Sequence, residues 1–329
     1  MPANLTPEYL EADRRFRLAK TGAEKVEALE LMLAVIPKHK GTEKLQADIK
    51  RRLSKLRGEM QKKGGPKRAY LFSVDRQGAG QVLLVGPPNS GKSSLLAALT
   101  NALPEVADYP FATRRPLPGM MAFENIKIQL VDLPPISPGL TEGWVYSIVR
   151  NGDLLMMVLD LQASGLLEET EMLLGELERA RLRPGNWPSW KEPDAGGFWQ
   201  KRALMIGNKA EGSVTQESME ILRGLYRDRF SLVAVSALTG EGLDKIPAQT
   251  FQLLEIVRVY TKTPGKEPSL QEPVVLDQGS TVLDLAAAIH KDFRYQLKYA
   301  RIWGPGKYDG QRVERDYVVQ DGDVIELHA

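Results

Sequence analysis

Hydrophobic and polar residues follow two different periods along the chain, and the change falls near Gln81. In "EKLQADIKRRLSKLRGEMQKK" the apolar residues Leu45, Ile49, Leu53 and Leu56 recur at helical spacing, with lysine and arginine on the remaining positions. After Gln81 come short runs that are apolar at successive positions: "QVLLV", "NIKIQLVD", "LLMMVLD", "ALMIG" and "LVAVS". Strands with two apolar faces are typical of a parallel sheet covered by helices on each side. The pattern therefore predicts an α/β domain that follows a helical region.

Caps and chain breakers predict what flanks the α/β domain. Thr6 with Pro7 and Thr42 are each suited to begin a helix, and "PKHKG" interrupts the helical segments, so we expect an N-terminal helical hairpin. Near the other end, "PVVLDQGSTVLDLAAAIHKDF" predicts a strand, a turn and an amphipathic helix, which short strands with Gly/Asp turns follow. The expected parts are a helical region with a basic end, the α/β domain, a linker and a small α+β module, at residues 1–66, 67–262, 263–272 and 273–329.

The composition narrows the class of protein. The 329 residues are 43% hydrophobic and 26% charged, which is typical of a soluble protein with more than one domain. The chain has no run of about 18 apolar residues, and its first residues lack the pattern of a secretion signal, so we expect a cytoplasmic protein with no membrane partner. The absence of cysteine excludes disulfides, thiolate catalysis and cysteine-bound zinc. His39, His290 and His328 are too far apart in sequence to indicate a metal site.

Positive charge is concentrated near the N-terminal end. Residues 1–68 contain 17 lysines and arginines against 9 acidic residues, although the net charge of the whole chain is only +2. Most of the excess lies in "KRRLSKLRGEMQKKGGPKR", residues 50–68. Such a block suits a polyanionic partner such as RNA or the ribosome. The alternative is a solvated helix end followed by a basic linker, and the sequence leaves both open.

The segment "VLLVGPPNSGKSSLLAAL" fits a phosphate-binding loop in sequence and in context. An apolar strand precedes its Gly-x-x-x-x-Gly-Lys-Ser string and an apolar helix follows. The two glycines allow the backbone to curl so that successive amides point at phosphates, and the helix N-terminus adds partial positive charge. Lys92 is expected to contact the β- and γ-phosphates. The expected nucleotide-binding residues of this loop are Gly86, Asn89, Ser90, Gly91, Lys92, Ser93 and Ser94.

Later motifs favour guanine over adenine. In "GNKAE", after the "ALMIG" run, Asn208 and Lys209 are expected to brace the purine, and Glu211 to accept hydrogen bonds from the guanine N1 and N2 donors. In "VSALTGEG", the backbone of Ser236 and Ala237 is expected near guanine O6. Because adenine does not present two donors at this place, a carboxylate there selects GTP over ATP.

Three residues form the expected magnesium site. The Ser93 hydroxyl is expected to bind Mg²⁺ directly, and Asp132, which ends the strand in "VDLPP", is placed to hold it through water. Thr113 in "ADYPFATRRPLPGMM" is the expected switch residue, which binds Mg²⁺ when the γ-phosphate is present. The expected catalytic residues are Lys92 and Thr113.

These motifs carry a resemblance to a known family. "GPPNSGKSSLLAALT", "DYPFATRRPLPGM", "VDLPP" and "GNKA" resemble the Obg-related GTPases, and the part after residue 273 resembles a TGS domain, a ubiquitin-like β-grasp module. "LTPEYLEADRRFRLAKT", "IPKHKGTEKLQADIKRRLSKL" and "VRVYTKTPG" resemble the developmentally regulated GTP-binding (DRG) proteins in particular. The resemblance implies a P-loop GTPase domain, GTP binding, modest hydrolysis and association with ribosomes or translation.

The chain departs from this family in its second switch. Pro135 stands where the glycine of the family's Asp-x-x-Gly motif donates its amide to the γ-phosphate, and proline has no N–H. Ile136 follows, so no glutamine orients the attacking water, and hydrolysis is expected to be slow or to depend on another group. In potassium-dependent relatives an asparagine that matches Asn89 helps to bind K⁺. The resemblance therefore raises potassium stimulation as one interpretation, and an asparagine that only shapes the loop as the other.

Two further departures concern the base and a loop. Glu211 replaces the aspartate of Asn-Lys-x-Asp, and its longer side chain loses more entropy on binding, so we expect weaker but guanine-selective binding. The DRG proteins have an additional small domain where this chain has only "RPGNWPSWKEPDAGGFWQ", residues 183–200. Its tryptophans, Trp187, Trp190 and Trp199, are expected to pack against the protein's own surface, the alternative being a contact site for a protein partner.

Together the motifs predict a GTPase that hydrolyses GTP to GDP and phosphate with Mg²⁺ and acts as a ribosome- or RNA-associated switch, through its basic helical region and its TGS domain. Two alternatives remain. One is a nucleotide-gated ribosome- or RNA-binding protein with negligible turnover, which Pro135 and Ile136 favour. The other is an ATP-using P-loop enzyme, for which Glu211 leaves an opening.

Overall fold

The structure is a computed structural model, and it describes most of the chain from Val74 onward and a few residues before it. The described residues are 14, 16, 28, 29, 32, 36, 49, 51, 74–100, 102, 115–187, 192–290, 293–304 and 307–328. The chain divides into two compact units, Met1–Ser73 and Val74–Ala329.

In the first unit, the described residues agree with the expected helices. Residues 14, 16, 28, 29, 32, 49 and 51 are helical. Leu29, Met32 and Ile36, which recur at helical spacing, are at most 5% exposed, whereas Arg51 is exposed. The turn of the expected hairpin and nearly all of the basic segment 50–68 lie outside the described residues.

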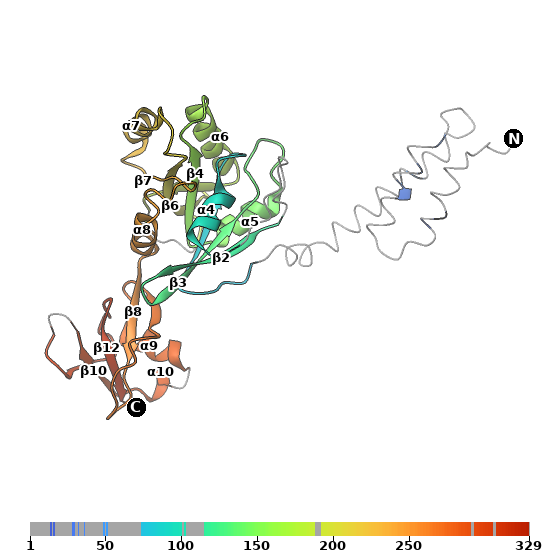
Figure 1. Ribbon diagram of the computed structural model, residues 1–329. Helices are drawn as coiled ribbons and strands as arrows, with labels where there is room; N and C mark the ends of the chain where they lie inside the picture. The colour runs from blue at the N-terminus through green and yellow to red at the C-terminus, as the bar shows by residue number, and fades with distance from the viewer. Residues whose placement is uncertain are drawn as a thin grey trace. The chain divides into compact units, whose positions relative to one another are not determined.

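A seven-stranded sheet forms the first part of the second unit. Its strands run in the order β2-β3-β1-β4-β6-β5, and β7 also pairs with β6. Figure 1 labels β2, β3, β4, β6 and β7 of this sheet, with helices on either side. The strands are β1 (Gln81–Val85), β2 (Leu117–Phe123), β3 (Ile126–Asp132), β4 (Leu154–Asp160), β5 (Leu182–Gly185), β6 (Trp199–Asn208) and β7 (Ser231–Ala234). Neighbouring strands are parallel except β2 and β3, which are antiparallel. The expected mostly parallel sheet of a GTPase domain is confirmed.

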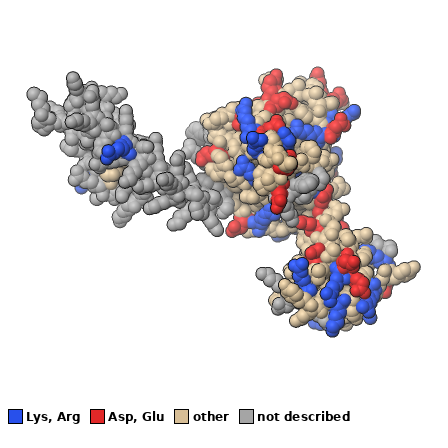
Figure 2. All heavy atoms as spheres, turned by 180° about the vertical axis from the view of Figure 1, so that it is seen from behind, with Lys and Arg blue, Asp and Glu red and all other residues tan. Residues whose placement is uncertain are grey.

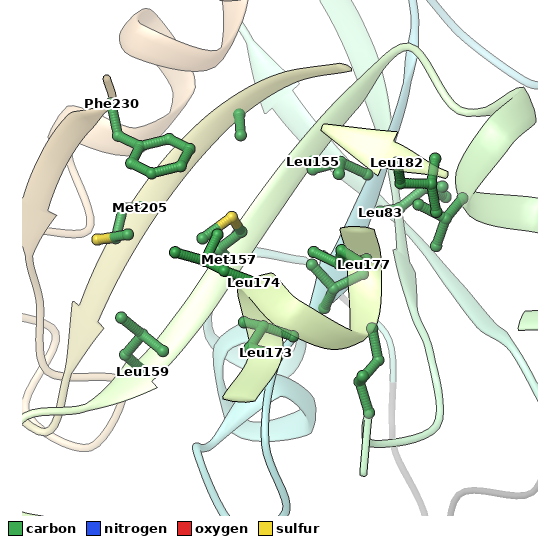
Figure 3. Close-up of a cluster of buried hydrophobic side chains, with 14 of the residues drawn as sticks. Leu83, Leu155, Met157, Leu159, Leu173, Leu174, Leu177, Leu182, Met205 and Phe230 are labelled. Carbon is green, nitrogen blue, oxygen red and sulfur yellow. The ribbon is translucent and has the colours of Figure 1, made fainter. Parts of the chain in front are cut away.

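Helices cover both faces of this sheet. They are α4 (Lys92–Leu99), α5 (Gly143–Asn151), α6 (Leu166–Arg179), α7 (Thr215–Tyr226) and α8 (Lys245–Leu254). Because side chains alternate along β1, Leu83 and Val85 join one buried cluster with α5, α6 and α7, while Val82 and Leu84 join another with α4 and α8. Figure 3 shows the first cluster, in which leucines of α6 lie against side chains of β4. In the described part of the chain, no helix is long and apolar enough to cross a membrane.

A second sheet with two helices forms the C-terminal part. Its strands, in the order β11-β10-β12-β8-β9, are β8 (Ile256–Thr261), β9 (Val274–Asp277), β10 (Tyr299–Trp303), β11 (Gln311–Val313) and β12 (Val324–His328). The helices are α9 (Val282–Ile289) and α10 (Phe293–Gln296), and Thr281 begins α9 with a capping box that includes Asp284. This arrangement is the expected β-grasp module.

Strand β8 differs from the sequence-based domain boundary. The sequence assigned residues up to 262 to the α/β domain and 263–272 to a linker. In the structure β8 pairs with β9 and β12, so it belongs to the second sheet. The physical reason is burial, because Val257 and Val259 pack in the same cluster as α9.

An arginine on β8 fastens the two sheets to each other. Arg258, only 12% exposed, forms ion pairs with Glu124 in the β2–β3 turn and with Asp321 just before β12. Asn125, in the same turn, donates to the hydroxyl of Tyr260 at 2.6 Å. The β2–β3 hairpin is therefore attached to the second sheet at its turn, while its other end lies beside the phosphate loop.

Candidate nucleotide-binding site

The predicted site residues that the structure describes are brought together at one edge of the first sheet. The phosphate loop follows β1, Asp132 ends β3, Asn208 ends β6, and Ser236 follows β7. The carboxyl ends of neighbouring parallel strands lie along one edge, and ligands bind where the strand order reverses. Since β1 lies between β3 and β4, the phosphate loop is at such a point.

The backbone between β1 and α4 has the curl that a phosphate site needs. Gly91 has φ +88° and Asn89 has φ +60°, both in the left-handed region. A Cβ at Gly91 would lie 2.2 Å from Nδ2 of Asn208, and a Cβ at Gly86 would lie 2.3 Å from the carbonyl oxygen of Val158. A larger residue at Gly86 would meet this backbone oxygen, and one at Gly91 would displace the Asn208 side chain and be strained by the left-handed φ. The loop then leads directly into α4, whose first amides have no partner within the helix.

The ammonium group of Lys92 lies across this loop. Nζ donates to the carbonyl oxygens of Gly86 at 3.2 Å and Pro87 at 2.9 Å. Burial lowers the pKa of Lys92 to about 8, and the nearby charge of Asp132 acts in the opposite direction. A buried ammonium with mostly neutral partners gains stabilisation when phosphate oxygens approach it.

Ser93 and Asp132 form a donor set that fits Mg²⁺. Ser93 Oγ donates to Oδ2 of Asp132 at 2.5 Å. The other carboxylate oxygen, Oδ1, is buried and has no hydrogen-bond partner among the described residues. Burial raises the pKa of Asp132, while the Ser93 hydroxyl and the charge of Lys92 lower it. An unpaired buried carboxylate oxygen beside a hydroxyl is a suitable place for Mg²⁺ or a water bound to it.

Ser93 and Asp132 are two of the three protein ligands that the sequence predicts for Mg²⁺. Thr113, the third expected ligand, lies outside the described residues. Over the residues that the structure describes, no group of three or more histidine, aspartate or glutamate side chains is arranged to hold a metal. Because Mg²⁺ keeps several waters and commonly binds substrate phosphates, two protein ligands are compatible with a nucleotide-dependent site.

The start of the second switch is fixed to the phosphate loop. The amide of Ile136 donates to the carbonyl oxygen of Gly86 at 3.0 Å, and its side chain is fully buried in the first cluster. Pro135, immediately before it, has no amide to offer a γ-phosphate. From the sequence, Ile136 was notable only because it is not the glutamine that orients the attacking water. The structure shows in addition that its side chain anchors this segment in the core.

Asn208 connects the phosphate loop to the loop expected near the base. Its side chain is 1% exposed, Nδ2 donates to the carbonyl oxygen of Ser90 at 3.0 Å, and Oδ1 accepts from the amide of Ala237 at 3.1 Å. Both ends of the side-chain amide are thus used within the protein. Asn208 therefore joins the two loops, and these two bonds leave the second N–H of Nδ2 and the second lone pair of Oδ1 unused.

The other base-site residues lie beside this connection. Lys209, with φ +63°, pairs through Nζ with Oδ2 of Asp160 at 2.5 Å. Ser236 is fully buried, and its Oγ accepts from the amide of Thr239 at 3.0 Å, which closes the loop that presents Ala237. Glu211 is exposed at the same edge of the sheet.

Sequence reasoning missed Asp160. This carboxylate ends β4 and holds the ammonium of Lys209. A signal was present, because an aspartate that closes the apolar run "LLMMVLD" lies at the carboxyl edge of a parallel sheet, where ligands bind.

The tryptophan-rich loop 183–200 packs partly as expected. Trp199 is half-buried against the first cluster. Trp187 is 36% exposed, its indole lies close to Gly185, and its carbonyl oxygen accepts from Nε of Arg202 at 2.8 Å. Trp190 lies outside the described residues.

Comparison with known proteins identifies two domain families in the chain. Residues 81–184 match the 50S ribosome-binding GTPase family, and residues 257–329 match the TGS domain. Together with the phosphate loop and the two sheets, these matches define a P-loop GTPase with a C-terminal TGS domain.

Relatives that align along most of the chain indicate which kind of GTPase the chain resembles. An uncharacterized GTP-binding protein of Methanocaldococcus jannaschii is 28% identical over 92% of each chain. Developmentally-regulated G-protein 1 of Arabidopsis thaliana is 28% identical over 92% of this chain and 90% of its own. The resemblance to the DRG proteins read from the motifs is thus confirmed, since relatives of this type align along 92% of the chain. The structure of the Schizosaccharomyces pombe YchF GTPase, 15% identical with a TM-score of 0.52, covers 77% of this chain and 99% of its own and supports the fold alone.

Proposed function

We propose that this protein hydrolyses GTP to GDP and phosphate with Mg²⁺, and that the two nucleotide states regulate its association with the ribosome or another RNA in the cytoplasm. The observation that carries the proposal is the Asn208 connection. One buried side chain holds the phosphate loop and the Ala237 loop at a fixed separation, as a ligand with a base at one end and phosphates at the other requires.

In the proposed reaction, the protein's main role is to position and to stabilise charge. The amides of residues 89–94 and the Lys92 ammonium stabilise the negative charge on the phosphates. Ser93, Asp132 and Thr113 would hold Mg²⁺, which would supply positive charge against the phosphates. Water attacks the γ-phosphorus directly, and the bond to the β–γ bridging oxygen breaks to leave GDP, with no covalent enzyme intermediate.

The rate of this step is proposed to be low. Pro135 offers no amide to the γ-phosphate, and the amide of Ile136 is already bonded to Gly86. Asn89, exposed with its backbone in the left-handed region, is the proposed ligand for a stimulating K⁺. The same two switch residues favour the second candidate function, a nucleotide-gated binding protein with negligible turnover.

Nucleotide titration of the purified apo protein tests the choice of base. GTP and GDP are expected to bind with Mg²⁺, and ATP to bind far more weakly. Glu211→Gln removes the carboxylate that accepts from guanine and is expected to lower GTP affinity by roughly tenfold or more without effect on ATP. Glu217→Gln, an exposed glutamate on α7, is the matched control and is expected to leave both affinities unchanged. Tighter binding of ATP than of GTP would show that the site does not prefer guanine and would contradict the proposal.

Single-turnover hydrolysis with K⁺ or Na⁺ separates the two candidate functions. A slow rate above buffer that K⁺ increases, and that Asn89→Ala makes independent of K⁺, supports the GTPase. A rate equal to buffer in both salts supports the nucleotide-gated binding protein. Co-sedimentation with ribosomes in GDP and in a non-hydrolysable GTP analogue then tests the partner, and the proposal expects the two nucleotides to differ.

A further inference from the structure

A cavity of about 460 Å³ lies at the edge of the first sheet opposite to the phosphate loop. Gln81 begins β1, Asp153 immediately precedes β4, and Lys201 lies near the start of β6, so the amino ends of three neighbouring strands line it. Leu254 and Ile256, where α8 leads into β8, line it as well. Since a seven-residue strand such as β4 spans about 20 Å, this amino-edge cavity is separate from the phosphate loop.

Lys201 is a buried cation of the amino-edge cavity with donors to spare. The residue is 7% exposed, and its Nζ donates to the carbonyl oxygen of Gly152 at 2.8 Å. This is the one hydrogen bond of Nζ within the part of the chain that the structure describes, so two N–H groups of the ammonium are left without an acceptor. Burial lowers the pKa of Lys201 to about 8, although the charge of Asp153 acts in the opposite direction. An anion that enters the cavity therefore stabilises this charge.

The arginines of the cavity differ in how fully their donors are used. Arg202 is occupied by Glu255 and by two backbone carbonyl oxygens. Arg76 pairs with Asp153 at 2.9 Å and also bonds to a backbone carbonyl oxygen. Arg150 makes a single hydrogen bond to the described residues, from Nη2 to the carbonyl oxygen just after α6 at 2.9 Å. The buried ammonium and Arg150 are therefore the cations that can bind a further acceptor.

The charge of the cavity is positive on balance. Four basic and two acidic residues line it, and Glu255, which is not part of the lining, balances one of the basic residues. One positive charge is thus left over. On the face of the molecule in Figure 2, basic and acidic side chains are interspersed over the described surface of the α/β domain. That surface offers a polyanion no continuous run of positive charge, whereas the cavity can hold one small anion.

We propose that the amino-edge cavity binds a small organic phosphate monoester, whose phosphate oxygens accept from Lys201 and Arg150. The organic part lies against Trp199 and Leu254, which are among the apolar residues of the lining. The volume is in the range of sites for small organic molecules, about 300–1,000 Å³, and is larger than a bare phosphate needs.

A phosphate fits these donors better than a carboxylate. A monoester has three terminal oxygens and a charge of about −1.5 to −2 at pH 7, whereas a single carboxylate has two oxygens and one charge. The donors come from two separate elements, because Lys201 lies on β6 and Arg150 on α5. Three oxygens that point in different directions can meet both of them.

Calorimetric titration of the full chain tests the proposal. The probes are phenyl phosphate, inorganic phosphate and phthalate, each added with excess GDP and Mg²⁺ so that the phosphate loop is filled. Phenyl phosphate is expected to bind more tightly than inorganic phosphate, because it also contacts the apolar lining, and more tightly than phthalate. Lys201→Met is expected to weaken phenyl phosphate binding roughly 10- to 150-fold, the contribution of a hydrogen bond to a charged group.

Two lysine variants are the controls. Lys298→Met changes an exposed lysine just before β10 and is expected to bind phenyl phosphate as the wild type does. Lys92→Met changes the phosphate loop at the other edge of the sheet and is also expected to leave phenyl phosphate binding unchanged. Thermal melting checks that each variant is folded.

Carbamylation by cyanate locates the ligand without a variant. Isocyanic acid adds across the N–H bond of a neutral amine to form a urea, and about half of the Lys201 side chains are neutral at pH 8. Phenyl phosphate is expected to slow the carbamylation of Lys201, measured by mass spectrometry of its peptide, and to leave that of Lys298 unchanged.

The outcomes separate this proposal from the proposed function. Absence of binding by both phosphate probes, or equal binding by the wild type and Lys201→Met, would overturn the cavity site. Tighter binding of phthalate than of phenyl phosphate would overturn the choice of a phosphate. Binding that is lost in Lys92→Met would show that the probe occupies the phosphate loop and would overturn the proposal as well. A protein that binds no GDP would contradict the proposed function alone, because the titration of Lys92→Met without nucleotide still measures the cavity.

Discussion

Replacement of Asn208 by alanine tests whether this residue organises the nucleotide site. The substitution removes the donor to the Ser90 carbonyl oxygen and the acceptor for the Ala237 amide. Ser90 is fully buried, whereas Ala237 is half-buried and its amide gains access to water more easily. Each buried group left without a partner costs about 1–3 kcal/mol, so a state in which both groups stay buried is destabilised by about 2–4 kcal/mol. In the apo variant the loops can open to water, so the free energy of unfolding is expected to fall by less than this.

The same energy is expected to appear in nucleotide affinity. In the apo variant the two loops can relax so that water reaches both groups, and binding of a nucleotide that touches both loops buries them again without partners. A penalty of about 2–4 kcal/mol corresponds to a loss of roughly 30- to 700-fold in GDP affinity. Pyrophosphate touches only the phosphate loop, so its affinity is expected to fall much less.

Fluorescent-GDP titration, pyrophosphate competition and urea unfolding measure these effects. Asn125→Ala is the matched control, because Asn125 also makes two donor bonds, to Tyr260 at 2.6 Å and Leu270 at 3.1 Å, but lies in the β2–β3 turn. It is expected to lower stability and to leave GDP affinity within about twofold, since no loop of the site depends on it. A folded Asn208→Ala protein that binds GDP within about threefold of wild type would refute the reasoning.

Three further predictions follow from single contacts. Pro135→Gly restores an amide near the γ-phosphate and is expected to shift affinity toward a GTP analogue relative to GDP by about 1.5 kcal/mol, or roughly tenfold, in a competition assay; an unchanged ratio contradicts it. Burial lowers the pKa of Lys201 from 10.5 to about 8, which penalises the folded state by about 3 kcal/mol below pH 8 and progressively less as pH rises to 10.5. Lys201→Met loses the bond to the Gly152 carbonyl oxygen, worth about 1 kcal/mol, so urea unfolding at pH 7 is expected to show a net gain of about 2 kcal/mol that disappears by about pH 10; a gain that is independent of pH contradicts it. Arg258→Met removes the ion pairs to Glu124 and Asp321 and is expected to destabilise the protein by about 1–3 kcal/mol and to split its calorimetric transition into two, whereas one unshifted transition contradicts the role of Arg258 in fastening the sheets.

Much of the nucleotide site was predictable because it is local in sequence. The spacing of Gly86, Gly91 and Lys92 predicts which backbone amides would face a phosphate in the proposed site, and the apolar strand and helix on either side predict where the loop lies. The small α+β module was predictable for the same reason, because its strand, turn and amphipathic helix lie in consecutive residues, whereas its β-grasp fold was implied only by the resemblance to a TGS domain. The boundary between the α/β domain and this module was not predictable, because the pairing of β8 with β9 and β12 depends on residues far along the chain.

The sequence by itself determined the order of the elements, the glycines that allow the phosphate loop to curl and the motifs that favour guanine, since each depends on neighbours a few residues apart. Only the tertiary structure decided that Asn208 joins two loops, that Asp160 holds Lys209, and that Ile136 fixes the second switch to the core. The physical reason is that hydrophobic periodicity specifies which face of a strand is buried but not which strand lies beside it. These contacts exist only once the order β3-β1-β4-β6 has placed the ends of distant strands along one edge.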